Sequence, residues 1–198
     1  MRETGRMSDQ KIPLVLVPGL LCDFNLWAHQ SRYLAEIAES SIAQSTLDDD
    51  LPAMARRILA DAPPTFALAG LSMGGYVCLE IMRQAPARVL KLALLDTSAR
   101  PDTPEQSARR RGLIELAEKG RFKGVTPRLL PLFVHPARLT DEDLTQAVME
   151  MTERVGKDTF LRQQKAILAR PDSRPALAGI DAPTLVACGR EDQVTPLE

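Results

Sequence analysis

Short apolar runs alternate along the chain with longer segments of helical period, and this alternation predicts the secondary structure. Strands are predicted where apolar runs end in turn residues, over 13–18, 40–44, 65–70, 89–96 and 182–189. Helices are predicted over 25–38, 49–62 and 73–85. Because the strands are apolar on both faces and are separated by helices, we expect an α/β protein with a parallel sheet covered on both sides.

The pattern changes between the last two predicted strands. Residues 101–178 contain no convincing strand, and helices are predicted over 103–120, 126–134, 140–156 and 157–170. The last two have acidic residues in their first turns, which suit the positive end of a helix. We therefore predict a helical cap over 101–178, inserted into a core made of residues 11–100 and 179–198.

Composition and charge narrow the function classes. The chain has 198 residues, of which 44% are hydrophobic, and a formal net charge of −1. This balance provides no basic field for nucleic acid and no charged face for a membrane surface, so the electrostatics point to neither partner. The expectation of a small-molecule substrate comes from the motifs described below. The charge balance leaves the oligomeric state open.

The cysteines and the apolar run lengths indicate the compartment. Cys22, Cys78 and Cys188 are far apart and odd in number, which favours neither a disulfide framework nor a zinc site. The N-terminus lacks the apolar core of a secretory signal, and no run approaches the roughly 18 residues of a membrane span. A soluble, cytoplasmic protein is expected.

One serine stands at a junction between strand and helix. Gly70-Leu71-Ser72-Met73-Gly74 matches the pattern G-x-S-x-G, with an apolar run before it and a helical pattern after it. Such a turn is tight enough to expose the serine hydroxyl, and small residues such as Gly70 and Gly74 permit it. An ordinary strand–helix turn and a phosphate loop are the alternatives, but a phosphate loop would need a lysine near the helix start. We predict Ser72 as a nucleophile.

A nucleophilic serine requires donors for the developing oxyanion. The amide of Met73 lies at the predicted helix N-terminus and is one candidate. The second is the amide of Leu20, in the loop after the first strand, where Gly19 allows a bend. The alternative for Leu20 is a plain connecting turn.

The acid and the base of a catalytic triad are expected at the same edge of the sheet. Asp192 follows the last predicted strand and fits the acid, with Glu191 and Asp96 as competitors. Asp96 is better explained as a cap or as a hydrogen-bond anchor for the adjacent turn. Of the two histidines, His29 is expected to be half-buried in the first helix, and His135 lies in the predicted cap. The expected catalytic histidine would therefore lie beyond Glu198.

These segments together resemble the α/β-hydrolase family: "VPGLLCD", "GLSMGG", "LALLDTSAR" and "GREDQVTP". The resemblance spans residues 13–198 and is closest to bacterial carboxylesterase and enol-lactonase-like members with a small helical cap. It implies a three-layer fold with strand order 4-3-5-6-7 in the family's numbering and with the last strand missing.

The same resemblance implies roles for single residues. Ser72 would be the nucleophile, Asp192 the acid, and the amides of Leu20 and Met73 the oxyanion hole, with no metal or organic cofactor. Two departures stand out: Pro18-Gly19 replaces the His-Gly of many relatives, and the C-terminal strand with the histidine is missing.

The resulting hypothesis is a serine hydrolase that cleaves a small carboxylic ester, lactone or thioester through an acyl-enzyme. As a C-terminally truncated chain it is expected to be nearly inactive. Two alternatives remain: a cofactor-free lyase or carbon–carbon hydrolase on the same fold, and a non-catalytic binding protein that retains the serine turn.

Overall fold

The computed structural model describes residues 11–196, and its five strands form one parallel sheet. Their order is β2-β1-β3-β4-β5, and every neighbouring pair runs parallel. The strands are β1 (Ile12–Val17), β2 (Ala38–Ile42), β3 (Phe66–Leu71), β4 (Val89–Leu95) and β5 (Thr184–Ala187). This is the predicted order 4-3-5-6-7, so the expected parallel sheet is confirmed.

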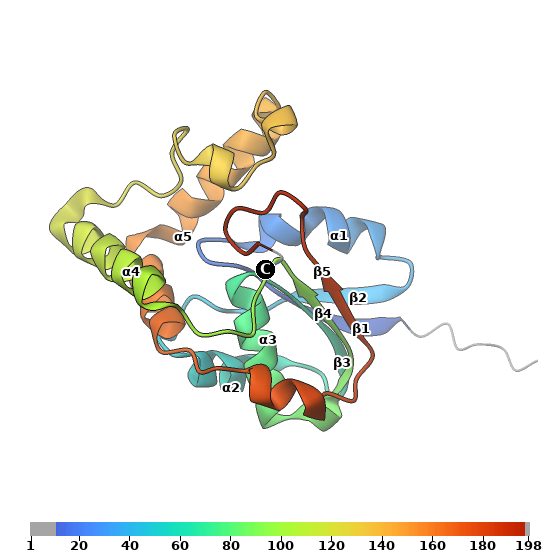
Figure 1. Ribbon diagram of the computed structural model, residues 1–198. Helices are drawn as coiled ribbons and strands as arrows, with labels where there is room; N and C mark the ends of the chain where they lie inside the picture. Colours follow the sequence, from blue (N-terminus) through green and yellow to red (C-terminus); the bar gives the residue numbers. More distant parts are fainter. Residues whose placement is uncertain (1–10, 197–198) are drawn as a thin grey trace, which may run out of the picture.

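Helices cover the sheet on both faces, which gives three layers (Figure 1). The helices α2 (Leu51–Asp61) and α3 (Met73–Gln84) lie on one face, and η1 (Phe24–Trp27) with α1 (Ala28–Tyr33) lies on the other. Alternate residues of each strand point to opposite faces. Accordingly, Val15 and Val17 of β1 join the core around α3, whereas Leu16 packs with Trp27.

The two faces are covered unequally. The α3 face holds the large buried core, but the cluster on the α1 face has only three buried members, Leu16, Trp27 and Ala69. At the β5 edge, Leu185 and Val186 are 59% and 71% exposed. An open pocket of about 400 Å³ lies on the α1 face, between η1 and the ends of β3, β4 and β5.

Residues 101–178, here called the helical segment, leave the sheet after β4 and return before β5. The segment contains α4 (Pro104–Leu116), the π-helical turn η3 (Ala117–Arg121), η4 (Leu130–Leu132), η5 (Pro136–Arg138), α5 (Glu142–Leu168) and most of η6 (Arg174–Gly179). Figure 1 shows α4 and the first half of α5 standing away from the sheet. No helix within residues 11–196 combines the length and apolar character needed to cross a bilayer.

Local chemistry explains where these helices begin and bend. Thr103 and Gln106 form a capping box at the start of α4, and the carboxylate of Asp141 accepts the amide hydrogen of Leu144 at the start of α5. Gly156 adopts φ 78° and ψ 175°, which divides α5 into two helical halves. This kink separates the predicted helices 140–156 and 157–170.

A buried cluster of charges joins the two ends of the helical segment. Asp102 lies at its beginning, and Arg170 lies near its end. An oxygen of Asp102 is 2.7 Å from Nη1 of Arg170, and the other is 2.7 Å from Nε of Arg110. Because both Asp102 and Arg170 have almost fully buried side chains, removing one partner would leave the other buried without a counter-charge.

Two predicted helices are wrong in part. The helix predicted over 25–38 ends at Tyr33, because the chain turns there and begins the edge strand β2 at Ala38. This strand, "AESSI", is polar and half-exposed, so it lacks the apolar run that marks the other strands. The helix predicted over 126–134 is reduced to the short turn η4, since Pro127 and Pro131 each lack an amide hydrogen for a continuous helix. The remaining short turn, η2 (Pro86–Arg88), precedes β4.

Candidate active site

Ser72 occupies a strained turn between β3 and α3. Its backbone angles are φ 54° and ψ −115°, in a region that non-glycine residues rarely adopt. The turn is fixed from two sides. The amide of Ser72 donates to the carbonyl of Leu95 at 3.0 Å, and the hydroxyl of Thr97 donates to the carbonyl of Ser72 at 2.7 Å. The surrounding structure therefore holds Ser72 in a conformation that costs energy.

The glycines around Ser72 are required by close packing rather than by their own backbone angles. A Cβ added to Gly74 would lie 2.1 Å from the carbonyl oxygen of Val17 in β1. A Cβ on Gly70 would lie 2.4 Å from the carbonyl oxygen of Gly74 and 2.5 Å from Sγ of Cys78. The pattern G-x-S-x-G is thus explained by how closely α3 approaches β1 and β3.

The loop after β1 lies directly against the serine. A Cβ built on Gly19 would be 3.6 Å from Cβ of Ser72, so the chain at Gly19 and Leu20 passes beside the Ser72 turn. Met73 is the first residue of α3, where a helix leaves amides without intrahelical partners. Among residues 11–196, no backbone carbonyl outside regular elements accepts the amide hydrogen of Leu20 or Met73. The two residues predicted to supply oxyanion donors, Leu20 and Met73, therefore lie next to the Ser72 turn.

A chain of hydrogen bonds runs along the carboxyl edge of the sheet from the serine to the last loop. Beyond the Ser72–Leu95 bond, the amide of Asp96 donates to the carbonyl of Ala187 at 2.9 Å. The amide of Gly189 in turn donates to Oδ1 of Asp96 at 2.8 Å. Asp96, itself at φ 42°, thus anchors the turn that begins the loop of Asp192.

Asp192 organises residues 188–195, here called the acid loop. Its Oδ1 accepts the amide hydrogens of Val194 and Thr195 at 2.7 and 2.9 Å, and its Oδ2 accepts the Thr195 hydroxyl at 2.6 Å. Partial burial opposes ionisation of Asp192, but the bonds from the Thr195 hydroxyl and from the two amides outweigh it. The pKa of Asp192 is consequently lowered from its ordinary value of 3.8.

Two thiols near the site have raised pKa values. Asp96, Cys188 and Asp192 bring ligand atoms within 4.8 Å of one another. Desolvation and the two carboxylates raise the pKa of Cys188, which favours the protonated thiol over the thiolate that binds metals. Beside the Leu20 loop, burial, with a smaller effect of Asp23, raises the pKa of Cys22 to about 12. The raised pKa values favour the protonated thiol over the thiolate at both positions.

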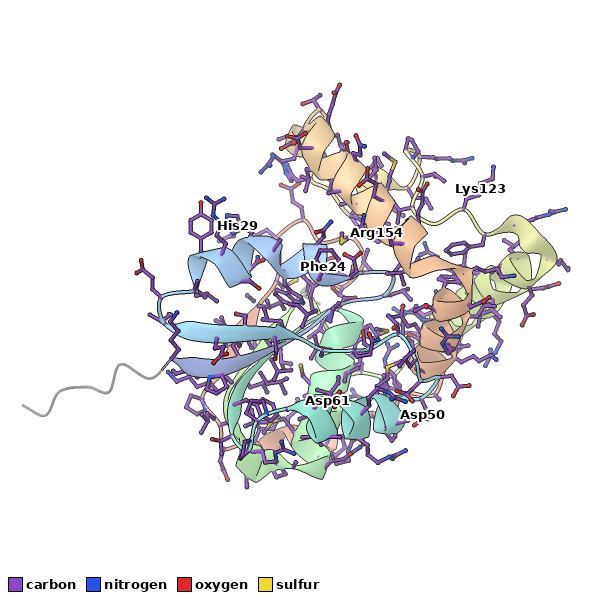
Figure 2. The ribbon with its side chains drawn as sticks, turned by 180° about the vertical axis from the view of Figure 1, so that it is seen from behind. Phe24, His29, Asp50, Asp61, Lys123 and Arg154 are labelled. Atoms are coloured by element: carbon purple, nitrogen blue, oxygen red, sulfur yellow. The ribbon has the colours of Figure 1, made fainter. Side chains whose placement is uncertain are left out.

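Neither histidine forms a hydrogen bond or ion pair with Asp192 within residues 11–196. Figure 2 shows His29 on the outer side of α1, where it stacks on Tyr33 with ring centroids 4.2 Å apart, so the half-buried position expected for it is wrong. His135 accepts the amide hydrogen of Ala137 through Nδ1, and its Nε2 lies 3.0 Å from the carboxylate of Glu191. His135 therefore joins the helical segment to the acid loop through Glu191.

Two residues with structural contacts at the site were not identified from the sequence. Thr97 both bonds Ser72 and fills the space beside Gly75, where an added Cβ would lie 2.3 Å from its hydroxyl oxygen. The doubled glycine Gly74-Gly75 was the only signal for this contact. Gln163, in the second half of α5, accepts the amide hydrogen of Leu21 at 3.0 Å, and no pattern in an amphipathic helix distinguishes it.

The strained serine, the adjacent loop and the parallel sheet together define a class of protein. A sequence profile described as the alpha/beta hydrolase fold matches residues 12–198. The chain belongs to the α/β hydrolase fold family.

Relatives within this family carry several activities. The chain is 30% identical to the dihydrolipoyllysine-residue acetyltransferase component of the acetoin cleaving system of Pseudomonas putida, over 93% of this chain and 53% of that protein. It is 26% identical to a pimeloyl-[acyl-carrier protein] methyl ester esterase of Vibrio parahaemolyticus, over 76% of this chain and 61% of the relative.

A solved structure is similar over nearly the whole chain. The malate-bound thermophilic esterase from Thermogutta terrifontis superposes with a TM-score of 0.82 at 25% identity, covering 96% of this chain and 75% of the esterase. The chain spans between about half and three fifths of the length of the two relatives above.

Proposed function

We propose that this chain provides the nucleophile, the oxyanion hole and the acid of a serine hydrolase that cleaves a small carboxylic ester, lactone or thioester. The observation that carries the proposal is the backbone of Ser72, held at φ 54° between a buried strand and a helix N-terminus. Strain of this kind persists only where surrounding contacts enforce it, and it is typical of functional sites. The names of the relatives, which include an esterase acting on a methyl ester, support the same chemistry.

The proposed reaction proceeds by acyl transfer. The Ser72 oxygen attacks the carbonyl carbon, its proton passes to the base, and the negative charge on the carbonyl oxygen is stabilised by the amides of Leu20 and Met73. The C–O or C–S bond to the leaving group then breaks, and the leaving group takes the proton from the base. Water activated by the same base hydrolyses the ester on Ser72 and restores the serine.

Asp192 is the proposed acid that orients the base. Its lowered pKa keeps it ionised, and an ionised carboxylate can hold an imidazolium. The base itself is proposed to be a histidine outside the 198 residues. This part of the proposal is supported by His29, which faces outward from α1, and by His135, whose Nε2 contacts Glu191 rather than Asp192.

We propose that the helical segment, residues 101–178, acts as a cap on a core formed by residues 11–100 and 179–198. Its support is that Ala117 and Phe160 pack on Leu21, and that Nε2 of Gln193 in the acid loop donates to the carbonyl of Pro131 at 3.5 Å. The three cysteines are free thiols, which supports a reducing compartment such as the cytoplasm.

Covalent labelling tests the nucleophile. The whole protein, expressed from its gene, is treated with a fluorophosphonate probe and assayed with p-nitrophenyl esters. We expect one labelled serine and ester turnover, both abolished by Ser72→Ala and both retained by Ser107→Ala in helix α4. A folded protein whose labelling and turnover survive Ser72→Ala would contradict the proposal.

The same assay separates the alternatives. A lyase or carbon–carbon hydrolase would be labelled at Ser72 without appreciable ester turnover, and a binding protein would show neither. The location of the base is tested by His135→Ala: turnover that depends on His135 would place the base in the helical segment and contradict our assignment.

A further inference from the structure

The side chain of Gln163 is a buried polar bridge between two loops. It lies in the second half of α5, is fully buried, and has both ends of its amide satisfied by backbone groups far away in sequence. Its Oε1 accepts the amide hydrogen of Leu21 at 3.0 Å, and its Nε2 donates to the carbonyl of Ser45 at 3.1 Å. Because an unpaired buried amide is costly, both bonds resist opening.

The first of these bonds acts on the loop proposed to supply an oxyanion donor. Leu21 has φ 58°, in the left-handed region that leucine rarely adopts. Its amide hydrogen belongs to the peptide group that joins Leu20 to Leu21. The bond to Gln163 therefore holds the plane of the peptide directly after the proposed donor, and within the same turn the amide of Cys22 donates to the carbonyl of Gly19 at 3.1 Å.

Other contacts from the helical segment hold the same loop, but those described next are made between side chains and not to a peptide group of Leu20. Phe160 and Ala117 pack on Leu21 in a small apolar cluster. Nε of Arg154 lies 2.7 Å from the carboxylate of Asp23, and Figure 2 shows Arg154 beside Phe24. Apolar packing and an ion pair between side chains place the loop approximately, whereas a hydrogen bond to a main-chain amide sets its direction.

We propose that Gln163 is a positioning residue, which holds the Leu20 amide in the direction needed to bind the oxyanion. This inference rests on the proposed function. Catalysis by an oxyanion hole depends on donors aligned before the reaction, and an error of about 1 Å costs on the order of 100-fold in rate. The helical segment thereby takes part in the stabilisation of the transition state, although none of its described residues is assigned a chemical role.

The chain contains a matched control for this inference. Gln164 is the next residue of α5 and is equally buried, but its Oε1 accepts from Arg110 within the helical segment. Gln163→Met and Gln164→Met each replace a buried amide by an apolar side chain of similar length. Only the first releases the amide of Leu21.

The experiment compares steady-state ester hydrolysis by the whole protein and by these two variants. Since transition-state contacts act on kcat, we expect Gln163→Met to lower kcat by roughly tenfold or more with KM within about twofold. Gln164→Met should leave kcat within about twofold. Amide exchange at Leu21 should accelerate only in the Gln163 variant.

Gln163→Asn covers the case in which the methionine variant does not fold. Its side chain keeps the amide but is one methylene shorter, so it cannot reach both Leu21 and Ser45, and the same loss of kcat is expected. A folded Gln163 variant with unchanged kcat would contradict the positioning role of Gln163, and so would an equal loss of kcat in the Gln164 variant. Either result would leave the proposed function intact. A parent protein without ester turnover or Ser72 labelling would overturn the proposed function, and this inference with it.

Discussion

The turn at Ser72 and the acid loop at Asp192 lie at the same edge of the sheet but are held in place by different means. The Ser72 turn is enclosed: Gly70 and Gly74 press against neighbouring backbone, and its hydrogen bonds go to Leu95 and Thr97 on other segments. The acid loop is largely exposed, and Asp192 bonds mainly to its own loop. The position of Ser72 thus depends on the packing of the whole core, whereas that of Asp192 depends on a few local hydrogen bonds.

The largest effect is expected from a methyl group added to the enclosed turn. In Gly74→Ala the new Cβ would lie 2.1 Å from the carbonyl oxygen of Val17, so α3 and β1 must move apart. We expect the free energy of unfolding, measured by urea denaturation, to fall by about 3 kcal/mol. The matched control is Gly112→Ala in α4, where no atom lies within 4 Å of the new Cβ. It should gain roughly 0.5–1 kcal/mol from helix propensity.

The strain at Ser72 predicts a gain in stability when the serine is replaced by glycine. Glycine adopts positive φ without the steric cost, although it also loses more conformational entropy on folding. We expect Ser72→Gly to raise the free energy of unfolding by about 1 kcal/mol while removing the hydroxyl group. Ser72→Ala serves as the control, because it removes the same hydroxyl and keeps the strain. Equal stability of the two variants would show that the turn is unstrained.

A change in the acid loop should have a smaller and more local effect. Thr195→Val keeps the shape of the side chain and removes the hydroxyl that donates to Asp192 at 2.6 Å. The free energy of unfolding is expected to fall by about 1 kcal/mol or less. Amide exchange should accelerate at Val194 and Thr195 and remain unchanged at Gly75. Equal acceleration at both places would mean that the two regions unfold together.

Lowering the pH should affect the acid loop and leave the Ser72 turn unchanged. The pKa of Asp192 is lowered in the folded chain, so its bonds contribute stability that is complete above the ordinary value of 3.8. That contribution is lost as the pH falls through the lowered pKa. The amide resonances of Val194 and Thr195 are expected to titrate below pH 3.8, while those of Gly74 and Gly75 stay constant. In Thr195→Val the titration should move upward toward 3.8.

The same contrast explains what could be predicted from the sequence. The sheet was predicted correctly, because each central strand is an apolar run, and the Ser72 turn was recognisable because its packing requires glycines at fixed spacing. Roles for Ser72, Asp192, Leu20 and Met73 stay predictions, although the loop of Leu20 and the start of α3 at Met73 both lie next to the serine. The edge strand was predicted at 40–44, but β2 spans Ala38–Ile42, and the helix predicted to end at 38 ends at Tyr33. Both errors arise because "AESSI" lacks the apolar signal of the other strands.

Long-range polar contacts could not be predicted. Gln163 and Gln164 are adjacent and chemically identical, yet one bonds a loop 142 positions away and the other bonds Arg110. Nothing in a local pattern distinguishes them, because the difference arises only when the loops after β1 and β2 meet α5. The contact between His135 and Glu191 likewise depends on how the helical segment folds back over the acid loop.

The kink at Gly156 also determines how freely this protein could change during evolution. In an uninterrupted helix each inserted residue would rotate everything beyond it by about 100°, and Gln163 would turn away from Leu21. At φ 78° and ψ 175° the helical phase is broken, so insertions or deletions before Gly156 need not alter the direction of Gln163. The outer part of the helical segment can therefore be remodelled, by natural selection or by segment exchange, while the inner half of α5 keeps its alignment with the loop.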